Sequence, residues 1–309
     1  MREYNYVGYP CMNRTLRERN PPRRCNRDMQ KKTFEDRGLA YAGELALQNL
    51  RDLYKIIQWN VEHGIYFYRC TSKLVPWNSR YNLESLPNFT EVKKQAKTIG
   101  DFIKSNSIRF TFHPSHWVKL ASPTKSTVNN SITSLNNHGQ WLDLLGLSRS
   151  PYYSINIHIG AHYNDKEATA ERFRKNFERL SHSAKSRVTV ENDDKQSLWG
   201  VEELAKEVSA EISIPITFDY HHHQFTDTGL TYQEAFELAK TTWPDGVPPI
   251  THYSEPKRLH ERDAGIRPQA HADTITPTQI PLWLLEESHI MLETGNKEQS
   301  VKLLHQYFS

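Results

Sequence analysis

Residues 187–219, RVTVENDDKQSLWGVEELAKEVSAEISIPITFD, predict a strand, a helix and a second strand in one continuous stretch. Arg187–Glu191 and Pro215–Asp219 are short runs rich in Val, Ile, Thr and Phe, which is typical of buried strands. Four apolar residues fall on one face of the intervening segment 201–212, which predicts an amphipathic helix. Two strands joined by a crossover helix are the unit from which parallel sheets are built.

The same alternation continues along the whole chain. The predicted strands are Asn5–Tyr9, Ile65–Arg69, Ile108–His113, Ser154–His158, Arg187–Glu191, Pro215–Asp219, Pro249–His252 and His289–Glu293. The predicted helices are Ala42–Glu62, Glu91–Lys104, Ser131–Leu145, Ala168–Ala184, Val201–Ile212, Tyr232–Thr241, Gln279–Glu287 and Gln299–Tyr307. Eight such pairs predict an α/β fold, a (β/α)₈ TIM barrel, as a single domain over residues 1–309. An open doubly wound sheet is the competing topology, disfavoured because its Gly-rich first turn is missing.

The composition excludes some classes of protein. Lys and Arg number 39 against 36 Asp and Glu, and this net charge of +3 excludes neither a nucleic acid nor a small molecule as partner. Three cysteines support neither a disulfide framework nor a cysteine-based zinc module. The chain has no G-x-G, so we expect no nucleotide cofactor. With no apolar run of about 18 residues and no secretory signal, we expect a cytoplasmic protein without a membrane span.

Histidine and carboxylate residues gather at the predicted strand ends. Six consecutive predicted strands end in one of them, and two more histidines follow in the loops. The eight residues are His113, His158, Glu191, Asp219, His222, His252, His271 and Glu293. In a (β/α)₈ barrel these ends converge on the face where active sites are built. Because clustered carboxylates repel one another, we expect divalent metal ions to compensate their charge.

The ligand types limit the metal. Imidazole and carboxylate without thiolate suit Mn²⁺, Zn²⁺ or Fe²⁺ better than a soft metal or Ca²⁺. Eight ligands are too many for one ion, and bridging carboxylates such as Glu191 and Asp219 favour two or three ions. Such clusters hydrolyse phosphate esters, but metal pairs also serve sugar isomerases of similar fold. The metal ligands alone therefore leave the reaction open.

The chain also contains a basic stretch, residues 13–37, with nine Lys or Arg and four acidic residues. It is interpreted either as a solvated loop or as an arm that follows the phosphates of DNA. Six other histidines, by contrast, are expected at the surface or as helix caps: His63, His138, His182, His260, His289 and His305.

Taken in order, the motifs resemble one family. They are GYPC with Asn13, FYR, FHP, HIG, ENDD, DYHHH, HYS, HAD and MLE, and they extend from residue 7 to residue 293. This series resembles the UV damage endonucleases. The resemblance implies a barrel with a metal cluster, usually Mn²⁺, with Zn²⁺, Mg²⁺ or Fe²⁺ as alternatives. It also implies nicking of double-stranded DNA immediately 5′ of cyclobutane dimers and 6-4 photoproducts, leaving a 3′-hydroxyl and a 5′-phosphate.

The resemblance assigns roles to individual residues. The eight metal ligands match those already selected, and four of them, Glu191, Asp219, His252 and Glu293, are expected to be catalytic. Tyr9 and Asn13 match positions that face the damaged nucleotides or the scissile phosphate. His116 and Trp117 match the two residues that probe the duplex, although the family usually has Gln followed by Tyr or Phe there. Trp117 can still stack on a base.

Two further departures concern metal ligands of the family. Arg80 stands where the family often has a ligating histidine, and we expect it to contact a phosphate instead. Ile250 stands where some members carry a modifiable lysine, so that ligand is absent. Three alternatives stay open: an abasic-site endonuclease, a sugar isomerase, and a lesion-binding homologue with impaired catalysis. We expect a monomer that associates with the nucleoid through DNA.

Overall fold

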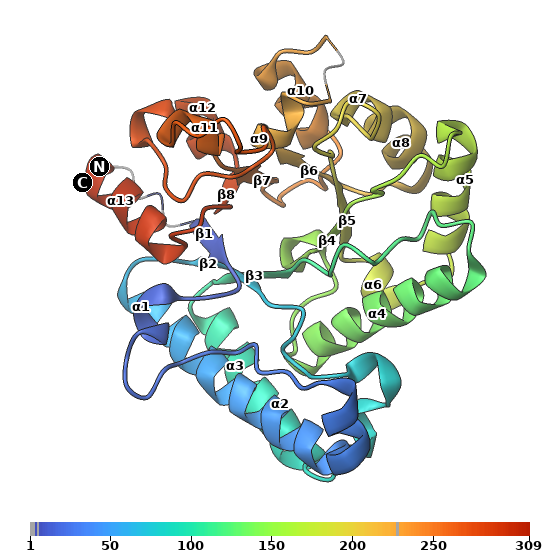
Figure 1. Ribbon diagram of the computed structural model, residues 1–309, viewed down its shortest axis with the longest axis vertical. Coiled ribbons are helices and arrows are strands. Elements are labelled where there is room, and N and C mark those ends of the chain that lie inside the picture. Colours follow the sequence, from blue (N-terminus) through green and yellow to red (C-terminus); the bar gives the residue numbers. More distant parts are fainter. Residues whose placement is uncertain (1–3, 5, 227–228) are drawn as a thin grey trace.

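The computed structural model describes residue 4 and residues 6–226 and 229–309. Eight strands form a closed parallel barrel in chain order, surrounded by a ring of helices (Figure 1). The strands are β1 (Val7–Pro10), β2 (Phe67–Cys70), β3 (Arg109–Phe112), β4 (Ile155–Ile157), β5 (Val188–Glu191), β6 (Ile216–Asp219), β7 (Ile250–Tyr253) and β8 (His289–Leu292). The (β/α)₈ barrel predicted from the sequence is confirmed.

Each predicted strand corresponds to an observed one, displaced by a few residues at its ends. The start of the first predicted strand, Asn5, lies outside the described residues. His113, His158 and Glu293 come directly after β3, β4 and β8, rather than within them. The ligand side chains therefore belong to the first residues of the loops as well as to the strand ends, and both positions face the barrel mouth.

The helices follow the predicted order. The longer ones are α2 (Lys31–Glu62), α3 (Phe89–Ser105), α4 (Lys125–Leu144), α5 (Lys166–Phe177), α10 (Tyr232–Lys240) and α13 (Glu298–Phe308). The shorter ones are α1 (Arg14–Arg17), α6 (His182–Lys185), α7 (Val201–Leu204), α8 (Ala210–Ile212), α9 (Tyr220–His223), α11 (Lys257–His260) and α12 (Leu282–Glu287). A π-helical turn, Ala205–Ser209, joins α7 to α8. None of the helices in the described part of the chain is long and apolar enough to cross a membrane.

The basic stretch 13–37 is not a continuous loop, as the sequence suggested. Asn13 caps α1 by accepting a hydrogen bond from the Leu16 backbone N–H, and α2 already begins at Lys31. Gly38 interrupts this helix with φ 60° and ψ −155°, a conformation that only glycine adopts without strain. The apolar periodicity begins only after this kink, which is why the sequence placed the start of the helix near Ala42.

Close packing of the outer helices fixes the barrel wall. The Cα of Gly100, in α3, lies against the chain that follows α4, and a Cβ at this position would be 1.5 Å from the carbonyl oxygen of Leu145. Strands β1 and β3 to β7 are buried along their whole length. A rigid wall of this kind holds the strand ends, and the ligands they carry, in fixed positions.

Candidate metal centre

Glu191, the last residue of β5, is the centre of the site. It is 1% exposed and belongs to three groups of possible metal ligands. Within each group, the ligand atoms lie within 4.8 Å of one another. The three groups are His113–His158–Glu191, Glu191–His252–Glu293 and Glu191–Asp219–His222. They are called triads A, B and C below. Seven of the eight expected ligands therefore converge: six come from the strand ends or the residues directly after them, and His222 comes from the short helix α9, which follows β6.

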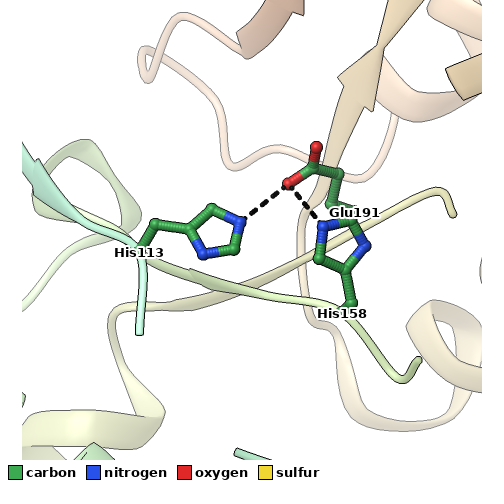
Figure 2. Close-up of side chains that lie close together, drawn as sticks. All are labelled: His113, His158 and Glu191. Carbon is green, nitrogen blue, oxygen red and sulfur yellow. Dashed lines mark hydrogen bonds and ion pairs between the residues drawn. The ribbon is translucent and has the colours of Figure 1, made fainter. Parts of the chain in front are cut away.

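Triad A uses one oxygen of Glu191. Its Oε2 lies 3.3 Å from His113 Nε2 and 3.5 Å from His158 Nε2. Figure 2 shows the two imidazole rings pointing at this oxygen from β3 and β4. The other ring nitrogen of His113, Nδ1, lies 3.0 Å from the carbonyl oxygen of Pro114, which fixes the ring orientation.

Triads B and C use the other oxygen. Glu191 Oε1 lies 2.9 Å from His252 Nδ1 and 3.6 Å from His222 Nδ1. In triad B, His252 Nδ1 is also 3.2 Å from Glu293 Oε1. In triad C, His222 Nδ1 is 3.6 Å from Asp219 Oδ2. The two oxygens of one carboxylate thus serve three groups of ligands.

His271, the eighth expected ligand, lies beside the triads but belongs to none of them. Its Nδ1 is 2.7 Å from Ser254 Oγ, and its ring centroid is 5.6 Å from that of His222. His271 is therefore close to triad C, and its role as a ligand stays a prediction.

The charges of the site are compensated only in part. Burial opposes ionisation of Glu191, but His252 and His158 hold the pKa of this carboxyl well below its usual range. Burial also disfavours a charged His158, yet Glu191, Asp193 and Asp219 together raise its pKa to about 10. For Asp219, burial is the dominant cause, and it raises the pKa of the carboxyl to about 7. For Asp219, therefore, the neighbouring His222 and His252 do not offset burial and the carboxylates of Glu191 and Glu293.

Three residues that surround the ligands were not selected from the sequence. Asp193 is 4% exposed, and its Oδ1 lies 3.1 Å from His158 Nδ1, on the side of the ring that faces away from Glu191. Asn156 donates a hydrogen bond to Glu191 Oε2, and Arg69 forms an ion pair with Glu293. The signals were present: Asp193 belongs to the ENDD motif, and Asn156 precedes His158 by two residues, so it shares its side of the strand.

The residues expected to contact DNA fall into two groups. Tyr9 and Asn13 are both 0% exposed, and they are bonded to each other because Asn13 Nδ2 donates to the Tyr9 hydroxyl, 2.9 Å away. The Tyr9 hydroxyl in turn donates to Asn60 Oδ1 at 2.6 Å. This buried arrangement ties β1 and the loop after it to α2, and contact of these two residues with nucleotides stays a prediction.

His116, Trp117 and Arg80, in contrast, are exposed. Trp117 is 45% exposed and, together with Arg80, lines a cavity of about 400 Å³ between the loops that follow β2 and β3. Arg80 stands where the family often has a ligating histidine, and its contact with a phosphate stays a prediction. Trp117 is exposed, and its stacking on a base stays a prediction.

The site fits divalent metal ions. Its donors are imidazole nitrogens and carboxylate oxygens, the set preferred by Mn²⁺, Zn²⁺ and Fe²⁺. Asp219 Oδ2 is buried without a hydrogen-bond partner in the described residues, and a cation would satisfy it. A closed (β/α)₈ barrel whose mouth carries clustered imidazole and carboxylate groups defines a class, the barrel proteins with side chains that could hold metal ions at the C-terminal ends of the strands.

Within this class, the chain belongs to the UV-endonuclease UvdE family, whose model matches residues 5–308. The crystal structure of SacUVDE is similar over 98% of this chain and 97% of that one, with a TM-score of 0.83 and 31% identity. Endonuclease IV from Thermus thermophilus has the same barrel, with a TM-score of 0.55 and 15% identity over 82% of this chain and 93% of that one. At that identity the likeness concerns the fold alone.

Curated relatives lead to the same family. The UV-damage endonuclease of Schizosaccharomyces pombe is 31% identical over 96% of this chain and 49% of its own length. The putative UV-damage endonuclease of Acanthamoeba polyphaga mimivirus is 31% identical over 98% of this chain and 91% of its own length. The chain thus spans about half the length of the first of these relatives and most of the second.

Proposed function

We propose that this chain is a metal-dependent DNA repair endonuclease that nicks double-stranded DNA immediately 5′ of UV photoproducts. Its substrates are cyclobutane dimers and 6-4 photoproducts, and its products carry a 3′-hydroxyl and a 5′-phosphate. The observation that carries the proposal is the convergence of triads A, B and C on Glu191 at the mouth of the barrel. Membership of the UV-endonuclease UvdE family supports DNA as the substrate.

The ligands hold two or three divalent ions, with Mn²⁺ as the proposed metal. When bound, such ions supply activation of water near neutral pH and stabilise the charge that develops on the phosphate oxygens. Glu191 and Asp219 provide the negative charge that attracts the ions, while His252 and Glu293 complete triad B. Arg69 restrains Glu293 through its ion pair, so this carboxylate stays in one orientation.

The surface around the mouth supports a polyanionic substrate. Arg17, Arg19 and Arg24 are exposed, and the structure gives these side chains no carboxylate partner among the described residues. Arg23 and Arg27, from the same basic stretch, are instead paired with Asp52 at 3.2 and 2.6 Å. The basic stretch therefore has arginines available for DNA phosphates, and it has two others whose ion pairs with Asp52 hold it against α2.

The exposure of His116, Trp117 and Arg80 supports contact of these three side chains with DNA. Trp117 stacks against the bases where the lesion leaves the duplex, with His116 beside it, and Arg80 contacts a phosphate. Tyr9 and Asn13 shape the wall against which the damaged nucleotides lie. Turning the lesion out of the stack is least costly where pairing is already weakened. The protein acts as a monomer on chromosomal DNA in the cytoplasm.

A plasmid nicking assay tests this function. Supercoiled plasmid, either UV-irradiated or untreated, is incubated with the protein in Mn²⁺ or in chelator. We expect nicking only of irradiated plasmid and only with Mn²⁺. Equal nicking of both plasmids, or activity that survives the chelator, would contradict the proposal.

Oligonucleotides distinguish the alternatives. Cleavage of a duplex with an abasic site, without cleavage of a dimer-containing duplex, would indicate an abasic-site endonuclease instead. Binding of the dimer-containing duplex in Mn²⁺ without cleavage would indicate a lesion-binding homologue. This alternative is considered because Arg80 stands where the family often has a metal ligand. Cleavage immediately 5′ of the dimer, with a ligatable 3′-hydroxyl and 5′-phosphate, is the result expected here.

A further inference from the structure

An exposed arm follows β7 on the same face as the metal ligands. It comprises residues 257–268, begins with α11, and is called the α11 arm. Its base is closed by an antiparallel bridge between Pro256 and His271 and by a hydrogen bond from the Lys257 N–H to the Ala270 carbonyl at 2.8 Å. Because His271 lies beside His222 of triad C, the base of the arm lies next to the metal centre.

The arm is held in one shape. Glu255, which is 5% exposed, accepts a hydrogen bond from the Thr276 N–H and lies 2.6 Å from His260 Nε2. Across the arm, Arg258 Nε donates to the carbonyl of Ile266 at 2.6 Å. These contacts tie both ends of α11, so its exposed side chains are presented at fixed positions. Binding would therefore cost little ordering of the backbone.

The side chains at the surface of the arm combine an apolar tip with positive charge. Leu259 is 74% exposed, far more than Trp117. Residues 257–268 contain four basic and two acidic residues. Lys257 is paired with Glu261, but Arg262 lies exposed without an ion pair in the described residues. An exposed apolar side chain with Arg258 and Arg262 near it in the sequence fits a nucleic-acid duplex, in which phosphates flank a groove lined by base edges.

The barrel places the arm opposite Trp117. In the closed order β1 to β8, three strands separate β3 from β7 in either direction, so the loops after these two strands emerge on opposite sides of the mouth. Figure 1 shows α11 beside β7 and β8, and α4, into which the loop after β3 leads, on the other side of the barrel. A duplex that lies across the metal centre would therefore pass over the loop that carries Trp117 on one side and the loop that carries Leu259 on the other.

We propose that the α11 arm is a second DNA-contacting element, which binds the duplex on the side of the metal centre opposite Trp117. Leu259 enters the groove and packs against base edges, while Arg258 and Arg262 bind phosphates. This inference rests on the proposed function, because it takes duplex DNA as the substrate. The α11 arm adds a second apolar contact, Leu259, to the contact that the sequence predicted for Trp117. The lesion is then contacted from both sides of the metal centre.

Binding assays with the metal-loaded protein test the arm. The probes are two labelled duplexes, one undamaged and one with a cyclobutane dimer and a methylphosphonate at the bond 5′ of the dimer, which resists cleavage. For Leu259→Ala we expect about ten-fold weaker binding of the lesion duplex. Leu303→Ala, which truncates a 39% exposed leucine on α13, is the matched control and should bind as the wild type does. Unchanged melting temperatures would show that all variants fold.

A second variant tests the charges. For Arg262→Ala, which leaves the contacts that hold the arm intact, we expect weaker binding of both duplexes and a salt dependence whose log–log slope is smaller by about 0.9, the effect of one lost phosphate contact. Wild-type binding by both variants would overturn the inference while the nicking assay leaves the proposed function intact. A change of oligomeric state in Leu259→Ala, measured by light scattering, would overturn it too, since Leu259 would then contact another copy of the chain. Failure of the wild type to bind either duplex would overturn the proposed function itself.

Discussion

Replacing Asp193 by Asn should weaken metal binding in triad A and leave triads B and C loaded. Asp193 belongs to none of the triads, but its Oδ1 lies 3.1 Å from His158 Nδ1. A carboxylate behind a ligating imidazole orients the ring and makes it a better donor, and its loss costs about 10- to 100-fold in metal affinity. This range corresponds to about 1.4–2.7 kcal/mol. Because Asp193 is 4% exposed, solvent cannot replace the contact, and we expect the upper half of the range.

The assay is calorimetric titration of the metal-free protein with Mn²⁺, followed by metal analysis after dialysis. We expect the Asp193→Asn variant to retain one ion fewer than the wild type, with the remaining sites at unchanged affinity. Asp194→Asn is the matched control, because Asp194 is the neighbouring carboxylate and belongs to none of the three triads. An unchanged stoichiometry and affinity in Asp193→Asn, or the same loss in the control, would refute the assignment of Asp193 as a positioning residue for His158.

Three further outcomes are expected. Glu191→Gln should retain no ion after dialysis, and Mn²⁺ should no longer raise its melting temperature, since all three triads lose a ligand. Burial lowers the pKa of His138 from about 6.5 to about 4, so between these pH values the unfolded state binds a proton there that the folded state does not. The metal-free wild type should therefore lose about 3 kcal/mol of stability between pH 6.5 and pH 4. His138→Gln should not show this loss, as measured by unfolding at a series of acid pH values. Gly100→Ala should lower the free energy of unfolding by about 3 kcal/mol or more in urea titrations, because its Cβ would overlap the Leu145 carbonyl.

The barrel could be predicted because its strands are buried on both faces, so each appears in the sequence as a short continuous apolar run. The ligands could be predicted for a related reason. A charged or ionisable residue at the end of an apolar run, such as His252 or Asp219, is costly to bury in a hydrophobic core, so its presence there indicates a site. The apolar runs recur along the chain at regular intervals, and this pattern can be recognised in the sequence without coordinates. Most of the metal centre was accessible in this way.

Other features depend on orientation, which periodicity does not give. Asp193 and Asp194 are adjacent in the sequence, yet only Asp193 lies against His158. His138 was expected at the surface or as a helix cap, but it is 6% exposed because its face of α4 packs against Phe112. His271, also expected among the ligands, has its ring centroid 5.6 Å from that of His222, and its role as a ligand stays a prediction. In each case the deciding contact comes from a segment distant in the sequence.

The division of Glu191 between its two oxygens has a consequence for how the centre fills with metal. Oε1 serves triads B and C, whereas Oε2 serves triad A alone. Ions held in B and in C would share this oxygen as a ligand, and any change that one made in the affinity of the other would be reciprocal by thermodynamic linkage. Triad A uses the other oxygen, so an ion there would share the carboxylate with B and C but not the ligand atom. Loading should then resolve into a linked pair and a more independent third ion, so that the occupancy of one member of the pair reports on the other.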